Sequence, residues 1–237
     1  MKFMVMHKHD QDVEAGKLPS PEFIEAMGAL VGGMAQAGKL LDGDGLGASK
    51  TRSRVVVEGG KRSVVHGPFV GRNELPAAFA KITVGSREEA IEVATKMAHA
   101  IGGDLELEVS KLTEAWDLGL CEKPAGAPER YLVIHKATPA TEAGDAPNLE
   151  AIAKGLGDKG VLNATVTLAP SSRAKRLTWR GGTRKVIDGP FAESKELIGG
   201  FVILDVADMD ECMAYCAQYA DLMLTARDDL EIDIRPL

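Results

Sequence analysis

The sequence is short of cysteine and of long apolar runs, and each shortage excludes a class of protein. Its three cysteines, Cys121, Cys212 and Cys216, form an odd set without the spacing of a zinc site, which argues against a disulfide framework or a structural zinc ion. No stretch approaches the roughly 20 apolar residues that span a bilayer, so we expect no membrane partner. The first residues, MKFMVMHKHDQD, reach charged positions too early for a secretory signal. We therefore expect a cytoplasmic protein.

Positive charge is also in deficit. The chain has 28 Lys and Arg against 35 Asp and Glu, which gives a formal net charge of −7. Such a balance disfavours the phosphate backbone of nucleic acids as a partner. At 237 residues the chain has room for one large domain or for two smaller ones.

The chain repeats itself once. KFMVMHK at 2–8 aligns with RYLVIHK at 130–136, and EGGKRSVVHGPF at 58–69 aligns with RGGTRKVIDGPF at 180–191. Near the ends, LELEV at 105–109 aligns with LEIDI at 230–234. A repeat of this length predicts two domains.

The segment GLCEKPAGAPE between the two copies is rich in Gly, Pro and Ala, as expected of a linker. We therefore predict a first copy at residues 1–118, a linker at 119–129 and a second copy at 130–237.

Each copy has the pattern strand, helix, strand, hairpin, strand, helix, strand. In the first copy the helical spacing of apolar residues covers 21–37, and Gly59-Gly60 joins two β-branched runs as in a hairpin. The order βαββαβ with an extra hairpin is the ferredoxin-like plan, an α+β fold. Such a sheet is covered by helices on one face only. We therefore expect the two ferredoxin-like repeats to pack sheet to sheet around a pseudo-twofold axis.

Three motifs resemble those of the YCII-related, or DGPF-domain, family of the dimeric α+β barrel superfamily. They are the HK that closes the first strand, the stretch DGPFAESKELIGGFVILDV from Asp188, and the final IDIRPL. The resemblance is specific in the second copy and looser in the first, where His66 replaces the acid of DGPF. It implies a dimeric α/β-barrel that is here built by one chain. A monomer or a weak homodimer follows, in which the two repeats form an internal pseudo-dimer.

Relatives in this superfamily include small-molecule enzymes with a proposed His-Asp active site. Carried over by position, that pair is His135 and Asp188, and the first copy keeps a degenerate version in His7 and His66. A carboxylate beside an imidazole raises its basicity, which suits a general base near neutral pH. Arg176 and Arg184 are candidates for binding an anionic substrate group. Such chemistry needs neither a metal ion nor a cofactor.

Each of these residues also has a structural interpretation. Asp before Gly-Pro is a good turn former, His135 shares its strand face with Tyr131 and Val133 and fits a buried histidine equally well, and arginines on hairpin strands are commonly solvated.

Three functions therefore stay open, and enzyme status is undecided. One is a protein without established activity that binds a small anionic molecule at the His-Asp pair. Another is a cofactor-free lyase or isomerase that uses His135 and Asp188 as its general-base pair. The third is a regulatory or partner-binding module connected with sigma-factor signalling, as the gene neighbourhoods of the family imply.

Overall fold

The computed structural model describes residues 1–147, 149, 152, 161–192 and 194–237. The first part of the chain contains β1 (Lys2–Lys8), α1 (Gln11–Glu14), α2 (Pro21–Gln36), β2 (Leu40–Gly45), the 3-10 turn η1 (Ser49–Thr51), β3 (Ser53–Glu58), β4 (Lys61–His66), β5 (Pro76–Val84), α3 (Arg87–Ile101) and β6 (Leu105–Lys111). The second part contains β7 (Glu129–Lys136), α4 (Pro139–Glu142), β8 (Leu162–Thr167), the 3-10 turn η2 (Ser171–Arg173), β9 (Lys175–Arg180), β10 (Thr183–Asp188), β11 (Ile198–Asp205), α6 (Met209–Met223) and β12 (Leu230–Pro236).

These elements confirm the predicted α+β class with two ferredoxin-like halves. The strands form two six-stranded antiparallel sheets, in the orders β10-β9-β12-β1-β11-β2 and β4-β3-β6-β7-β5-β8. The first helix expected in the second copy falls largely on residues outside the described part. Among the described residues, no helix is long and apolar enough to cross a lipid bilayer.

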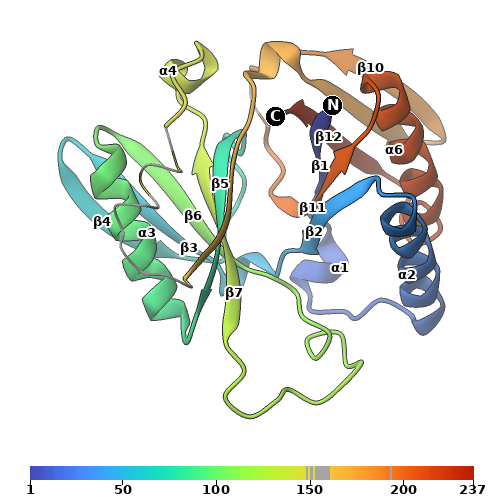
Figure 1. Cartoon of the computed structure of the whole chain (residues 1–237), viewed down its shortest axis with the longest axis horizontal. Coiled ribbons are helices and arrows are strands. Elements are labelled where there is room, and N and C mark those ends of the chain that lie inside the picture. Colours follow the sequence, from blue (N-terminus) through green and yellow to red (C-terminus); the bar gives the residue numbers. More distant parts are fainter. Residues whose placement is uncertain (148, 150–151, 153–160, 193) are drawn as a thin grey trace. The chain divides into compact units, whose positions relative to one another are not determined.

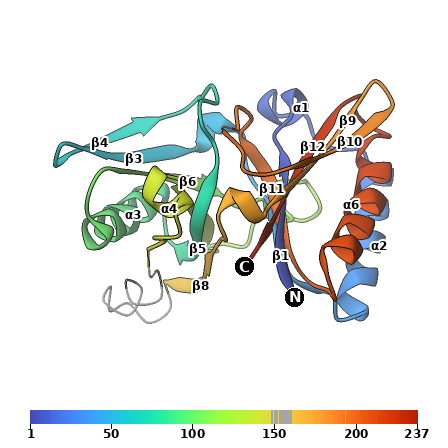
Figure 2. The same ribbon diagram turned by 90° about the horizontal axis from the view of Figure 1, so that it is seen from above.

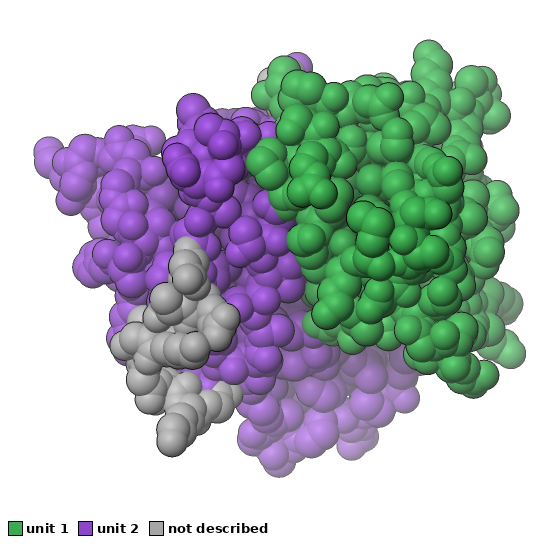
Figure 3. Space-filling model, turned by 45° about the horizontal axis from the view of Figure 1, so that its top comes forward, with its two compact units in different colours: residues 1–45, 169–192, 198–237 green, residues 46–168, 193–197 purple. Residues whose placement is uncertain are grey.

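Each sheet combines strands from both copies of the sequence repeat. Unit 1 consists of Met1–Gly45, Ala169–Ala192 and Ile198–Leu237, and unit 2 of Leu46–Leu168 and Glu193–Leu197 (Figure 3). In Figure 1 the blue strand β1 lies between the orange β11 and the red β12, to which it is hydrogen-bonded. In the same way β7 pairs with β5 and β6.

Sequence could not show this exchange, because β1 and β7 carry the same apolar pattern and either can fill the central position of either sheet. The boundaries 1–118, 119–129 and 130–237 stay a prediction about the sequence repeat. The sheet-to-sheet packing of the two halves also stays a prediction.

Helices cover one face of each sheet. In unit 1, α2 and α6 lie on the same side of the sheet (Figure 2), and side chains of α6 such as Cys212 and Cys216 pack on Phe3 and Val5 of β1. In unit 2, Ala90 and Ala94 of α3 pack with Val133 of β7. Side chains alternate between the faces of a strand, so His7 shares the helix-covered face with Phe3 and Val5, whereas Lys8 lies on the opposite face.

The Gly-Pro-Phe segment that follows β10 lies against the 3-10 turn η2. A Cβ atom built on Gly189 would lie 1.7 Å from the carbonyl oxygen of Ser171, so only glycine fits there. The Phe191 N–H donates to Ser171 Oγ at 3.1 Å, and the Gly189 N–H donates to the Ala174 carbonyl at 3.0 Å. The segment therefore fixes the end of the β9–β10 hairpin against the turn that precedes it.

The first copy repeats this arrangement in unit 2. A Cβ atom on Gly67 would lie 1.9 Å from the carbonyl oxygen of Ser49, and the Phe69 N–H donates to Ser49 Oγ at 3.0 Å. The glycine and phenylalanine of the motif thus have the same contacts in both units, although the acid before them does not recur.

We predict that Gly189→Ala lowers the free energy of unfolding by about 2–4 kcal/mol, because the new methyl group overlaps a backbone carbonyl that cannot rotate away. Gly33→Ala is the matched control. Gly33 is an exposed helical residue with no atom within 4 Å of its added Cβ, so this change stabilises by up to about 1 kcal/mol. Urea titrations of both variants measure the difference, and equal stabilities would contradict the close approach at Gly189.

Candidate functional site

Charged side chains gather on the face of each sheet that the helices do not cover. In unit 2, Leu107 and Val109 pack in the helix-covered core, so Glu108 between them points the other way. Arg54 of β3 and Lys136 of β7 lie on that same face and are buried. Charged groups are rarely buried unless they are paired, so Glu108, Arg54 and Lys136 mark a candidate functional site.

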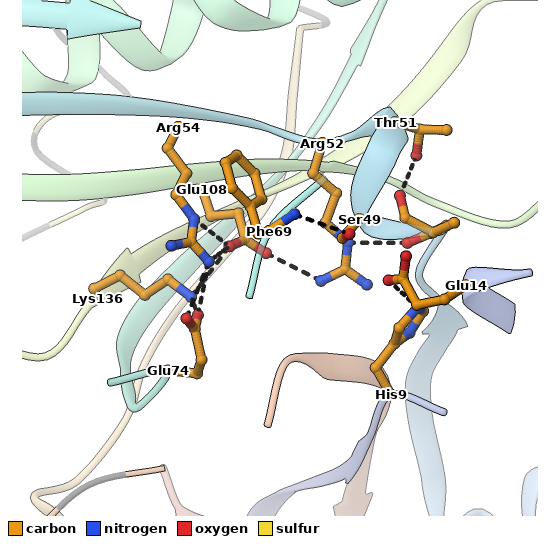
Figure 4. A network of polar contacts seen from close by, with 12 residues as sticks. His9, Glu14, Ser49, Thr51, Arg52, Arg54, Phe69, Glu74, Glu108 and Lys136 are labelled. Carbon is orange, nitrogen blue, oxygen red and sulfur yellow. Dashed lines mark hydrogen bonds and ion pairs between the residues drawn. The ribbon is translucent and has the colours of Figure 1, made fainter. Parts of the chain in front are cut away.

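The unit 2 cluster places two buried carboxylates among three cations (Figure 4), and the partly exposed Glu106 lies 3.3 Å from Arg54 Nε. Glu108 Oε1 accepts from Arg52 Nη1 at 3.0 Å, and Glu108 Oε2 accepts from Arg54 Nε at 2.9 Å. Glu74 comes from the loop after the Gly-Pro-Phe segment, and each of its oxygens lies 3.0 Å from Arg54 Nη2. Lys136 Nζ donates to Glu74 and lies 3.2 Å from Glu108 Oε2.

The carboxylates of this cluster are ionised at neutral pH. Burial alone would raise the pKa of Glu108, but the charges of Lys136, Arg52 and Arg54 outweigh it and lower that pKa to about 2. Burial also opposes ionisation of Glu74, and Lys136 and Arg54 lower its pKa below the usual value. The unit 2 cluster is therefore a buried salt-bridge network.

Unit 1 carries an equivalent cluster around Asp233. Arg176 Nε and Nη2 donate to the two Asp233 oxygens at 2.6 and 2.9 Å, and Lys8 Nζ donates to Oδ2 at 2.8 Å. Burial would raise the pKa of Asp233, but Lys8 and Arg176 lower it. Glu231 lies 3.3 Å from Arg176 Nε, and burial raises its pKa.

The phenylalanine of the Gly-Pro-Phe segment covers the arginine in both clusters. The Arg176 guanidinium carbon lies 4.4 Å from the centre of the Phe191 ring, and that of Arg54 lies 4.1 Å from the centre of the Phe69 ring. Stacking on an aromatic face favours a desolvated guanidinium. Three kinds of residue thus meet in each unit. They are the lysine that follows the histidine of β1 or β7, the arginine covered by phenylalanine, and the acid of β6 or β12.

The two clusters differ in one cation and one carboxylate, because Ala174 occupies the position aligned with Arg52. Glu74 is fully buried in the unit 2 cluster, whereas Glu196, which occupies the aligned position in the second copy, is exposed. Arg54 and Lys136 therefore share two buried carboxylates, Glu74 and Glu108. Their counterparts Arg176 and Lys8 share Asp233.

His135 and Asp188, the predicted catalytic pair, lie in different units. His135 belongs to β7 of unit 2, is 3% exposed on the helix-covered face, and burial lowers its pKa. Its Nδ1 has no hydrogen-bond partner within the described part of the chain. Asp188 ends the outer strand β10 of unit 1, and one of its oxygens accepts from Lys175 Nζ at 2.5 Å.

The degenerate pair of the first copy is also divided between the units. His7 lies in unit 1, and its Nδ1 is 3.0 Å from the Tyr219 hydroxyl. His66 lies in unit 2, where its Nδ1 is 3.0 Å from Ser53 Oγ. Ser53 aligns with Lys175, so the change of the acid to histidine accompanies a change of its cross-strand partner.

The two predicted anion-binding arginines have different surroundings. Arg176 is half-buried in the unit 1 cluster, as described above. Arg184 lies on the exposed strand β10, with its guanidinium carbon 5.7 Å from the centre of the Trp179 ring. Sequence reasoning missed Lys8, Lys136, Glu108 and Asp233. The available signal was a charged residue at the same place in both copies, inside otherwise apolar strands.

We predict that Glu74→Gln lowers the free energy of unfolding by about 3–5 kcal/mol, because it leaves buried cations without one of their two carboxylates. Glu196→Gln, the same change at the aligned exposed position, is expected to stay within about 0.5 kcal/mol of the wild type. Chemical denaturation compares the two variants. A wild-type stability for Glu74→Gln would contradict the buried contact.

The buried ring of His7 makes the stability of the fold depend on pH. Burial, followed by the charge of Arg227, lowers the pKa of His7 to about 3 from its usual 6.5. The neutral ring therefore stabilises the fold above about pH 6.5, and this contribution is lost as the pH falls towards 3, with a slope of up to about 1.4 kcal/mol per pH unit. We expect His7→Asn to reduce this slope in urea titrations at several pH values. The exposed His99→Asn serves as the control and should leave the slope unchanged.

Comparison with known proteins agrees with the motifs of the second copy. Residues 130–220 match the model of the YCII-related domain. An uncharacterized protein of Rhizobium meliloti (strain 1021) is 32% identical over 90 residues, which are 38% of this chain and 70% of that protein. No solved structure matches the chain. The matches do not test the tandem duplication, which stays a prediction, but the relative and the domain together show that the chain belongs to the YCII-related family.

Proposed function

We propose that this YCII-related protein binds a small carboxylate-bearing molecule in unit 1, at Lys8 and Arg176 beneath the Phe191 ring. The observation that carries the proposal is Glu74. In unit 2 a lysine and an arginine with the same positions in the repeat hold a second carboxylate from the protein itself. Unit 1 has the equivalent lysine, arginine and phenylalanine, but Glu196, which aligns with Glu74, is exposed and is not part of unit 1.

The charges of the unit 1 cluster favour an added anion. Three buried or half-buried cations, Lys8, Arg176 and Arg235, lie on the same sheet face as Asp233 and Glu231. Burial raises the pKa of Glu231, so its negative charge is the less stable of the two. A ligand carboxylate would lie beside these cations in a region of low dielectric constant, where pairing of opposite charges is strong.

The geometry also sets the size and shape of the ligand. The side chains of Lys8 and Arg176 are 4% and 13% exposed, so a small ligand that approaches from the side of Arg176 is part of the proposal. Arginine binds carboxylates through two parallel N–H donors, and its other faces accept an aromatic plane. The class is therefore a small mono- or dicarboxylate, with Arg176 retained from the predicted substrate-binding residues.

A base role for His135 with Asp188 is not part of this proposal. His135 is surrounded by the apolar core and the lowered pKa keeps its ring neutral, whereas Asp188 forms an exposed cross-strand ion pair. The exposed pair suits a hairpin end more than a buried catalytic dyad.

We expect small carboxylates such as formate, acetate and benzoate to raise the melting temperature of the wild type in a saturable way, relative to chloride at equal ionic strength, because a ligand that binds only the native state stabilises it. Lys8→Met should abolish this increment, whereas the matched change Lys136→Met in unit 2 should retain it. Differential scanning fluorimetry measures each increment against the variant's own baseline.

Arg176→Lys provides a milder second test, since it keeps the charge and loses the two-point contact. It should weaken the apparent affinity without abolishing folding. Absence of any carboxylate-specific shift in the wild type, or equal increments in Lys8→Met and Lys136→Met, would overturn the proposal.

A further inference from the structure

The strand β10 forms one edge of the unit 1 sheet, and among the described strands only β9 is hydrogen-bonded to it. All six of its residues are exposed, and among them Val186 and Ile187 are 48% and 44% exposed. Its pairing with β9 runs from Thr183 to Asp188 without a register shift. Natural edge strands are commonly protected by bulges, prolines, short length or charged side chains, and of these β10 has only the charges of Arg184, Lys185 and Asp188.

The backbone groups that β10 presents can be assigned from its hairpin. Gly181 and Gly182 have φ values of 54° and 73°, as in a type I′ turn, and Thr183 pairs with Arg180. In such a hairpin the residues flanking the turn exchange both hydrogen bonds, and alternate pairs follow. The bond from the Gly189 N–H to the Ala174 carbonyl agrees with this alternation. The N–H and C=O groups of Arg184, Val186 and Asp188 therefore point away from β9.

Near the turn of the β9–β10 hairpin, the charged side chains are all positive. Arg180, Arg184 and Lys185 lie there without a carboxylate in the hairpin tip, while Lys175 and Asp188 neutralise each other at the far end. Arg180 is 68% exposed and its nearest carboxylate, Glu231, is 3.8 Å away. This local excess stands out in a chain of net charge −7.

The equivalent hairpin of unit 2 lacks this excess. There Glu58 takes the place of Arg180 and lies opposite Lys61 in the strand register, and Arg62 Nη1 donates to Thr95 Oγ1 of α3 at 3.1 Å. The strand β4 is thus an edge of similar length and apolar content but with a compensated charge. It provides an internal control for the effect of charge.

We propose that the edge of β10 takes up an extended acidic segment of a partner protein as an additional strand. Main-chain hydrogen bonds to Arg184, Val186 and Asp188 supply affinity in this mode of recognition, and side-chain contacts supply specificity. Acidic residues of the partner contact Arg184 and Lys185, and its β-branched residues cover Val186 and Ile187. A second copy of this chain is disfavoured as the occupant, because two β10 strands would bring their arginines and lysines together.

The test is fluorescence anisotropy of a labelled peptide in which Glu-Glu pairs alternate with Val-Ile pairs, so that both faces of the added strand carry acidic and apolar residues, against a peptide with Lys in place of Glu. The wild type is expected to bind the acidic peptide and not the basic one, more weakly at high salt. Val186→Pro should reduce affinity at least about tenfold, because proline removes an outward N–H and leaves the bonds to β9 intact. Val64→Pro, the aligned change in β4, should bind as the wild type does.

Replacing both cations, Arg184→Glu with Lys185→Glu, should reverse the preference between the two peptides. Far-ultraviolet circular dichroism and urea titration confirm that each variant is folded. Lys8→Met should bind the acidic peptide normally, which separates this surface from the carboxylate site. Unchanged binding in Val186→Pro, or self-association of the wild type that Val186→Pro abolishes, would overturn the proposal.

Discussion

The rest of this structure depends on one constraint, the desolvation of charged side chains on the face of each sheet that the helices do not cover. A guanidinium or ammonium group removed from water costs several kcal/mol unless carboxylates compensate it with good geometry. Glu108 and Asp233, each in the last strand of a half, supply that compensation. Each of them is paired with an arginine of a hairpin strand and a lysine at the end of a central strand, so these residues of the chain form one set of mutually dependent charges.

The Gly-Pro-Phe segment can be understood in the same terms. Its glycine allows the chain to lie against the 3-10 turn, and its phenylalanine then covers the arginine. The acid before the glycine contributes less to this arrangement. In the first copy His66 stands there and contacts Ser53, and in the second Asp188 contacts Lys175, so two different cross-strand pairs occupy this position.

The sequence predicted the elements well because their apolar periodicity is strong and occurs twice. The helix expected over 21–37 is α2, and the hairpin expected at Gly59-Gly60 joins β3 to β4. The exchange of β1 and β7 was out of reach, since equivalent strands carry equivalent patterns. The charged clusters were missed for a different reason: a lysine or glutamate within a strand is normally interpreted as solvent-facing, and only a three-dimensional view shows that Lys136 and Glu108 neutralise each other.

The exchange of strands has a consequence for how the chain acquires its structure. Phe3 in β1 pairs with Pro236 in β12, so the central strand of unit 1 waits for the last residues of the chain before its sheet closes. Contacts between residues so distant in sequence make folding slow, because a large loss of chain entropy precedes the stabilising contacts. During synthesis the N-terminal strand therefore leaves the ribosome well before its neighbours exist. Neither half of the sequence contains a complete sheet, so we expect that neither sheet forms fully from one half alone.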